Sequence, residues 1–288
     1  MTMRSVKRVI PAMPTSDGAG VKLYRSLGSR DDARLDPFLM LDEFGTENPD
    51  DYIAGFPSHP HRGFETVTYM LDGHMRHEDH LGNVGDLKPG GVQWMTAGRG
   101  VIHSEMPKQS QGRMRGFQLW INLPAAEKMK PAHYRDIEAD EIPALPLPQG
   151  GLVRVIAGRA SIGGEPVQGP INSAQAPLST DPLYLDVTLA AGAVFEQPIS
   201  AGYNALAYAF EGDGSSAGTA LPGSTAVLYA QAGERVAVRA GEQGLRFLLL
   251  VGKPLGEPVV QYGPFVMNSV AEIEQVIADF EAGRFGAP

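Results

Sequence analysis

The chain has 288 residues, of which 43% are hydrophobic and 20% are charged. This length suits two domains of roughly 150 residues, and the composition is that of a globular protein rather than a disordered one. The absence of cysteine excludes disulfides, thiolate zinc sites, iron–sulfur clusters and cysteine nucleophiles. Any metal must therefore be bound by nitrogen and oxygen ligands. The net charge of -9 argues against direct binding to nucleic acid.

The sequence also lacks the usual signals for membranes and secretion. No apolar run approaches the roughly 18 residues of a membrane span, and the densest run covers residues 245–251. Basic residues between positions 4 and 8 are followed by Pro11 and Pro14, where a signal peptide would need an apolar stretch. A chain without cysteine needs no oxidising compartment. We therefore expect a cytoplasmic protein that binds neither a membrane nor nucleic acid.

Charge and histidine content divide the chain into two halves. Residues 1–139 carry 17 basic and 18 acidic residues, a net of -1, whereas residues 140–288 carry 7 and 15, a net of -8. All seven histidines lie at or before His133. The stretch 140–151 is rich in proline and glycine, which is typical of an extended linker. We expect two domains, 1–139 and 140–288, with the chemistry in the first.

Both halves are expected to consist mainly of β-strands. Short apolar runs are separated by frequent glycine (35) and proline (23), which favours sandwiches or barrels over a parallel α/β sheet. The two halves share this character without an exact repeat. In chain order, strands are predicted at residues 66–71, 117–123, 183–189, 205–210, 226–230 and 245–251.

One helix is predicted after Ser269. Ser269 can serve as its N-cap, and Glu272 three residues later completes a capping box. An apolar stripe at helical spacing predicts that the helix packs on a sheet. The stripe consists of Ile273, Val276, Ile277 and Phe280, and Gly283 and Gly286 can end the helix.

Two short motifs carry residue types that bind metals. In a strand, positions i and i+2 face the same side, so the histidines of His59-Pro60-His61 can reach one ion. His103-Ser104-Glu105 has the same spacing. If the two motifs lie on neighbouring strands, they supply three imidazole nitrogens and one carboxylate oxygen. This ligand set suits Fe(II), Mn(II), Ni(II), Cu(II) or Zn(II) and leaves a position open for catalysis; a closed structural zinc is the alternative.

The carboxylate ligand is ambiguous from spacing alone. Glu65 follows His61 by four residues and could share its face, so it competes with Glu105. His74, His77 and His80 lie at three-residue spacing between glycines, which favours a hairpin with surface or hydrogen-bonded histidines over a second metal site. The pair Asp42-Glu43 follows an apolar run and is interpreted as a strand end.

Several longer segments together resemble the signature of the pirin family, which belongs to the cupin superfamily. The two densest matches are residues 59–69 (HPHRGFETVTY) and 93–107 (QWMTAGRGVIHSEMP). Further matching segments are residues 35–44, 77–79, 119–123, 263–268 and 283–286.

The resemblance implies an all-β fold with two cupin-type β-barrel (jelly-roll) domains in tandem and a short C-terminal α-helix. It implies one divalent metal ion in the N-terminal barrel, usually iron, with no ligands in the second barrel. The family's metal ligands fall on His59, His61, His103 and Glu105, which leaves Glu65 a supporting or structural role. The family's pocket falls on Asp42 and Phe56. The duplicated barrel makes a monomer the expected state.

Two functions follow from this resemblance. One is a metal-dependent dioxygenase of the quercetin 2,3-dioxygenase type, which opens a flavonol-like phenolic ring with O2 and uses Glu105 as general base. The other is a metal- or redox-sensing protein that binds a transcription regulator or a metabolic enzyme. Of the two, the dioxygenase is the favoured hypothesis.

Overall fold

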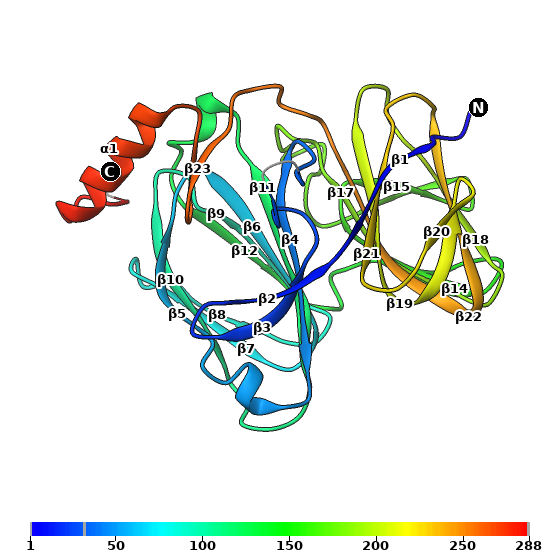
Figure 1. The fold of residues 1–288 in the computed structure, drawn as a ribbon, viewed down its shortest axis with the longest axis horizontal. Helices are drawn as coiled ribbons and strands as arrows, with labels where there is room; N and C mark the ends of the chain where they lie inside the picture. Colours follow the sequence, from blue (N-terminus) through cyan, green and yellow to red (C-terminus); the bar gives the residue numbers. More distant parts are fainter. Residues whose placement is uncertain (1, 31–32, 287–288) are drawn as a thin grey trace. The chain divides into compact units, whose positions relative to one another are not determined.

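The computed structural model describes residues 2–30 and 33–286, which form two compact units (Figure 1). The histidine unit, named for the seven histidines it contains, takes the described parts of Met13–Ser29, Phe38–Ala139 and Leu255–Pro288. The companion unit takes the described parts of Met1–Ala12, Arg30–Pro37 and Asp140–Pro254. One change of unit falls between Ala139 and Asp140. However, residues 255–286 return to the histidine unit, and residues 2–12 belong to the companion unit.

Two antiparallel sheets form the body of the histidine unit. The larger sheet has the order β12-β9-β6-β11-β4-β3-β2, and the smaller has the order β5-β10-β7-β8. The larger contains β2 (Met13–Asp17), β3 (Val21–Arg25), β4 (Phe38–Thr46), β6 (Phe64–Asp72), β9 (Val92–Thr96), β11 (Met114–Asn122) and β12 (His133–Ile137). The smaller contains β5 (Phe56–His61), β7 (Met75–Asp79), β8 (Val84–Leu87) and β10 (Val101–Pro107).

A nine-stranded antiparallel sheet and the separate β15–β16 pair form the companion unit. Its strands are β1 (Val6–Pro11), β13 (Ala144–Pro146), β14 (Gly151–Ala157), β15 (Arg159–Ile162), β16 (Glu165–Gln168), β17 (Leu183–Leu189), β18 (Val194–Pro198), β19 (Asn204–Ser216), β20 (Thr219–Leu221), β21 (Thr225–Tyr229) and β22 (Arg235–Gly252). The long β22 pairs with β18 through residues 235–239 and with β17 through residues 245–251, so it connects these two strands within one sheet. Its alternate residues Leu245, Phe247, Leu249 and Val251 enter the core.

The predicted linker is partly wrong. Residues 144–146 form strand β13, which pairs with β14 at the edge of the companion sheet, and Ile142 is buried. Proline is compatible with a strand at an edge, where a missing N–H removes no ladder bond. A proline-rich segment can therefore belong to a sheet.

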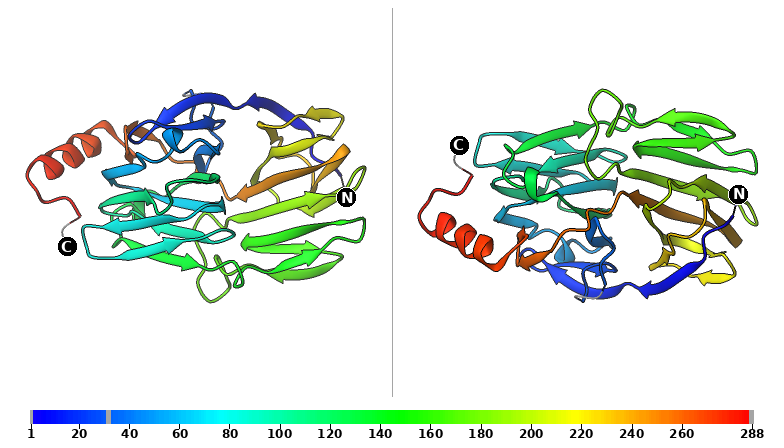
Figure 2. Two further views of the ribbon diagram at one scale, coloured as in Figure 1. Left: turned by 90° about the horizontal axis from the view of Figure 1, so that it is seen from below. Right: turned by 90° about the horizontal axis from the view of Figure 1, so that it is seen from above.

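Residues 255–286 close one end of the histidine unit. They form a hairpin of β23 (Val260–Tyr262) and β24 (Phe265–Met267), followed by α1 (Val270–Glu281). Both views of Figure 2 show the helix (red) beside this hairpin (orange). The ammonium group of buried Lys128 donates to Gly63 O, Val266 O and Asn122 Oδ1 at 2.6–3.0 Å, which ties the hairpin to the turn after β5. Gly63 has φ +91°, and a Cβ there would lie 2.0 Å from Val266 O.

The helix confirms Ser269 as the predicted N-cap, but the return bond of the predicted capping box comes from the N–H of Asn268, one residue before the N-cap. The N–H of Glu272 donates to Ser269 Oγ, and the Glu272 carboxylate accepts from Asn268 N. Ile273 and Val276 are buried against the hairpin, whereas Phe280 at the end of the stripe stays largely exposed. An all-β architecture with one short α-helix is thereby confirmed for the described residues, which also contain two 3₁₀ turns, η1 (Pro49–Asp51) and η2 (Ala125–Glu127). None of their helices is long and apolar enough to cross a membrane.

Candidate metal centre

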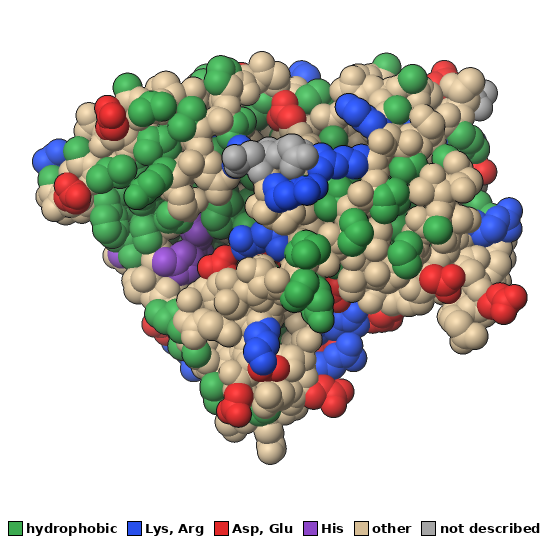
Figure 3. All heavy atoms as spheres, in the orientation of Figure 1, with side chains coloured by type: hydrophobic (Ala, Val, Ile, Leu, Met, Phe, Trp, Pro, Cys, Tyr) green, Lys and Arg blue, Asp and Glu red, His purple; other side chains and the backbone are tan. Residues whose placement is uncertain are grey.

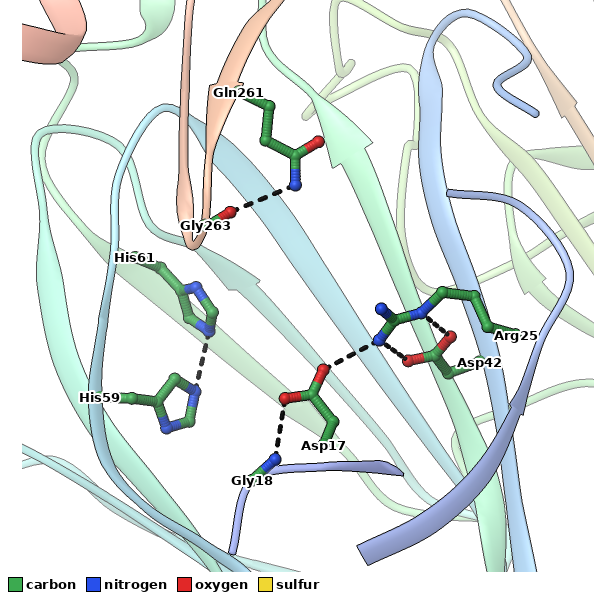
Figure 4. A network of polar contacts seen from close by, with 8 residues as sticks. All are labelled: Asp17, Gly18, Arg25, Asp42, His59, His61, Gln261 and Gly263. Atoms are coloured by element: carbon green, nitrogen blue, oxygen red, sulfur yellow. Dashed lines mark hydrogen bonds and ion pairs between the residues drawn. The ribbon is translucent and has the colours of Figure 1, made fainter. Parts of the chain in front are cut away.

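Three of the predicted ligands meet in the histidine unit. His59 and His61 lie on one face of β5, and the antiparallel β10 places His103 directly opposite His59. The Nε2 atom of His59 lies 3.0 Å from Nε2 of His61 and 3.0 Å from Nε2 of His103. Figure 4 shows the first two rings on β5 with the contact between their Nε2 atoms dashed, and the rings lie nearly perpendicular to each other. The donor atoms of all three histidines lie within 4.8 Å of one another.

The protonation of this cluster favours metal binding. Burial lowers the pKa of His61 and of His103 well below the usual value, and neighbouring histidines lower both further. The Nδ1 atom of His59 lies 2.8 Å from Pro57 O and must donate to it, so Nε2 of a neutral His59 holds a lone pair. Nitrogens bound at right angles about 2.1 Å from one ion would lie about 3 Å apart. The residues present therefore fit a divalent metal.

Glu105 lies beside the cluster on the same strand. The register between β10 and β5 shifts after His103, which places buried Glu105 opposite Phe56. Its Oε1 atom lies 3.0 Å from Thr68 Oγ1, which is also 2.6 Å from Gln118 Oε1. Glu105 lines the same cavity as His59 and His61, although the group of donors within 4.8 Å of one another contains only the histidines.

Glu65, the competing carboxylate, is engaged elsewhere. It accepts hydrogen bonds from Trp94 Nε1 at 3.1 Å and from Thr96 Oγ1 at 2.7 Å, and Lys130 Nζ lies 3.6 Å away. These partners lie on β9 and in the segment that follows β11. Its carboxylate thus joins strands β6 and β9 and does not line the cavity.

The second histidine cluster divides between surface and interior. His74 contacts Asp86 at 3.1 Å, and His80 accepts from Ile102 N; both fit the predicted hairpin. His77 differs, because β7 places it opposite Glu105 and buries it. Its Nδ1 lies 3.2 Å from Nδ1 of His103, and its ring packs on Tyr134. Three-residue spacing gave no sign of this position, which depends on strand register.

A cavity of about 600 Å³ opens from the histidines into the histidine unit. Figure 3 shows histidine side chains at the bottom of a hollow, with hydrophobic side chains on one side and charged ones on the other. The lining is mainly apolar and comes from both sheets and the tip of the β23–β24 hairpin. It includes Leu39, Met40, Phe44, Phe56, Trp120 and Pro264.

Asp42 and Phe56, predicted to be in the pocket from the resemblance, both line this cavity. The strand-end interpretation of Asp42-Glu43 is wrong: both lie within β4, are buried and pair with arginines. Arg25 Nε and Nη2 donate to the two oxygens of Asp42 at 2.7 Å each, and Nη2 also reaches Asp17 at 2.8 Å (Figure 4). Burial raises the pKa of Asp42 to about 6, although Arg25 opposes the shift.

Comparison with known proteins agrees with this architecture. A protein from Pseudomonas aeruginosa named "Putative quercetin 2,3-dioxygenase" is 53% identical over 283 residues, 97% of each chain. Human pirin is 42% identical over 280 residues, which cover 94% of this chain and 90% of that protein. The crystal structure of a quercetin 2,3-dioxygenase from Acinetobacter baumannii, 36% identical, superposes with a TM-score of 0.89 over 99% of both chains.

Family profiles cover both halves of the chain. The pirin profile matches residues 20–121, which contain the three clustered histidines and Glu105. The profile of the pirin C-terminal cupin domain matches residues 184–286. The two domains are therefore of the cupin type, as the sequence predicted, and the chain is a member of the pirin family.

Proposed function

We propose that the protein is a metal-dependent dioxygenase of the quercetin 2,3-dioxygenase type, which opens a flavonol-like phenol with O2 and releases carbon monoxide. The observation that carries this proposal is the cluster of three imidazoles beside a largely apolar cavity of about 600 Å³ that the Glu105 carboxylate also lines. That volume suits a small aromatic ligand. The names of relatives across the whole chain length support the same activity.

In this proposal His59, His61, His103 and Glu105 hold one divalent ion, with Fe(II) as the expected metal. When bound, the metal lowers the pKa of the substrate hydroxyl and orients the substrate for reaction with O2. Glu105 accepts the proton of that hydroxyl, and Thr68 holds the carboxylate in place. Apolar side chains such as Trp120 and Phe56 exclude water around the ring.

The first test measures metal and turnover on one preparation. Protein purified without tag histidines is analysed for bound metal, and oxygen uptake and carbon monoxide release are followed with quercetin. We expect one metal per chain and both gas signals, each lost in His61→Ala and retained in His74→Ala, which removes a histidine outside the cavity. Stoichiometric metal without oxygen uptake would contradict the enzyme and favour the regulatory hypothesis, in which a protein partner replaces the phenolic substrate.

A second test concerns the base. Glu105→Gln keeps the shape of the side chain but loses its basicity, so turnover should fall at least about a hundredfold. Glu78→Gln on the neighbouring β7 is the matched control, since Glu78 is exposed and outside the cavity. Full activity of a metal-loaded Glu105→Gln protein would remove Glu105 from the role of base.

A further inference from the structure

The cavity wall away from the histidines carries a charged group that the proposed chemistry does not use. Asp17, Arg25 and Asp42 form one connected network on β2, β3 and β4, and all three line the cavity. Figure 4 shows this network across the cavity from His59 and His61. Asp17 also accepts from Gly18 N at 2.8 Å, so the turn after β2 holds its carboxylate in place.

One part of the network remains open to a ligand. The Arg25 Nε and Nη2 protons are taken by the two carboxylates, whereas Nη1 has no hydrogen-bond partner among the described residues. In Figure 4 this nitrogen points away from both aspartates. The carboxylate oxygens also retain acceptor capacity, since each can accept more than one hydrogen bond. The network therefore offers donors and acceptors side by side.

Charge decides which ligand groups suit this wall. One guanidinium and two carboxylates carry a formal net charge of -1, and Asp42 is buried where its charge is poorly screened. A ligand carboxylate could use Nη1 but would face two like charges. A hydroxyl group both donates and accepts hydrogen bonds and carries no charge, so it matches a wall that offers donors and acceptors side by side. The rest of the cavity lining is mainly apolar, although Gln118 lies opposite Asp42, so most of the remaining ligand surface should be apolar.

We propose that Asp17, Arg25 and Asp42 form a recognition site for the hydroxyl groups of an uncharged aromatic ligand and reject ligands that carry a carboxylate there. The inference rests on the proposed function only in taking the cavity as the substrate site. Within the substrate class of the proposed function it assigns the direction of the ligand, with one hydroxyl toward the histidines and at least one other toward this network.

The test measures binding under anaerobic conditions, so that it does not depend on turnover. Three probes are titrated by calorimetry: 3-hydroxyflavone, quercetin, and 3-hydroxyflavone with a carboxylate on its 4′ position. The wild-type protein should bind quercetin about tenfold more tightly than 3-hydroxyflavone, because the added hydroxyls gain hydrogen bonds to charged groups. It should bind the carboxylated probe more weakly than 3-hydroxyflavone.

Two variants separate the contributions. Asp17→Asn keeps the acceptor for Gly18 N and brings the network to zero net charge; because Asp17 is half exposed, the fold should persist. In this variant the affinity for the carboxylated probe should rise about fivefold relative to the affinity for 3-hydroxyflavone. The double variant Arg25→Gln, Asp42→Asn removes the charged pair together, and its preference for quercetin should shrink to about twofold. Asp50→Asn, exposed and outside the cavity, should leave all three affinities unchanged.

The outcomes are distinct from those of the dioxygenase test. If Asp17→Asn leaves the ratio of carboxylated probe to 3-hydroxyflavone at the wild-type value, the inference is wrong, whether or not the protein turns over quercetin. If the ratios shift as expected while no oxygen is consumed, the recognition site stands and the dioxygenase proposal fails.

Discussion

The Nδ1 atoms of His77 and His103 lie 3.2 Å apart in the interior of the histidine unit. One of the two must carry the proton between them. Because Nε2 of His103 faces His59, a neutral His103 that offers its Nε2 lone pair to a metal keeps its proton on Nδ1 and donates it to His77. His77 thereby fixes the tautomer of His103, a proposed metal ligand, through the ring nitrogen opposite the one offered to the metal.

Replacement of His77 should weaken metal binding. Loss of such outer hydrogen-bond partners typically lowers metal affinity about 10- to 100-fold, so we expect this range for His77→Phe in competition with a chromophoric chelator. His74→Phe, on the same hairpin but paired with Asp86 at the surface, should keep the wild-type affinity. Equal affinities in the two variants would contradict the role of His77.

Thr68 should matter through its hydroxyl alone. Thr68→Val preserves the shape of the buried side chain but removes the contact to Glu105 Oε1, so oxygen uptake with quercetin should fall about tenfold at unchanged metal content. Thr68→Ser restores the hydroxyl and should restore most of the rate. If valine and serine behave alike, Thr68 does not position the carboxylate.

Lys128 should be a large contributor to stability. In Lys128→Met, Gly63 O, Val266 O and Asn122 Oδ1 lose their buried donor, and we expect a loss of about 3–5 kcal/mol in the free energy of unfolding of the histidine unit. Urea denaturation followed by tryptophan fluorescence measures it, because Trp94 and Trp120 both lie in this unit. Exposed Lys88→Met serves as control. A loss below about 1 kcal/mol would show that the three hydrogen bonds of Lys128 are dispensable for stability.

Stability of the metal-free protein should decrease in mild acid. The pKa values of His61 and His103 are lowered on folding, so below the usual value of 6.5 the unfolded chain binds more protons than the folded one. The stability that depends on these two neutral histidines is therefore fully present above pH 6.5, and the free energy of unfolding decreases as the pH falls below that value. Denaturation of chelator-treated protein at pH 7 and pH 5 should show this loss, reduced in His61→Asn and unchanged in His80→Asn.

Local periodicity accounts for what the sequence could predict. Both histidine motifs lie in strands, where i and i+2 share a face by backbone geometry alone, and the glycine-rich turns between them favour neighbouring strands. The helix and its cap were predictable for the same reason, since both depend on residues at most four positions apart.

The contacts that could not be predicted from the sequence depend on register between strands that are distant along the chain. Arg25 meets Asp42 because β3 pairs with β4, and His77 reaches the centre because β7 pairs with β10 opposite Glu105. Neither pairing is encoded in the spacing of the residues concerned. A one-residue slip would turn each side chain to the other face. The burial of Asp42 and Glu43 within β4 likewise depends on the pairing of β4 with β3 and β11, which the local sequence does not show.

The return of residues 255–286 to the histidine unit affects how the protein can be made and divided. On the ribosome, the cavity stays without Gln261, Gly263 and Pro264 until the intervening companion segment 140–254 has emerged. A fragment ending at residue 139 would contain all proposed ligands, yet Lys128 would lack the Val266 carbonyl and the cavity part of its wall. The half that carries the proposed ligands is therefore not a transferable module, and its maturation depends on synthesis of the companion unit.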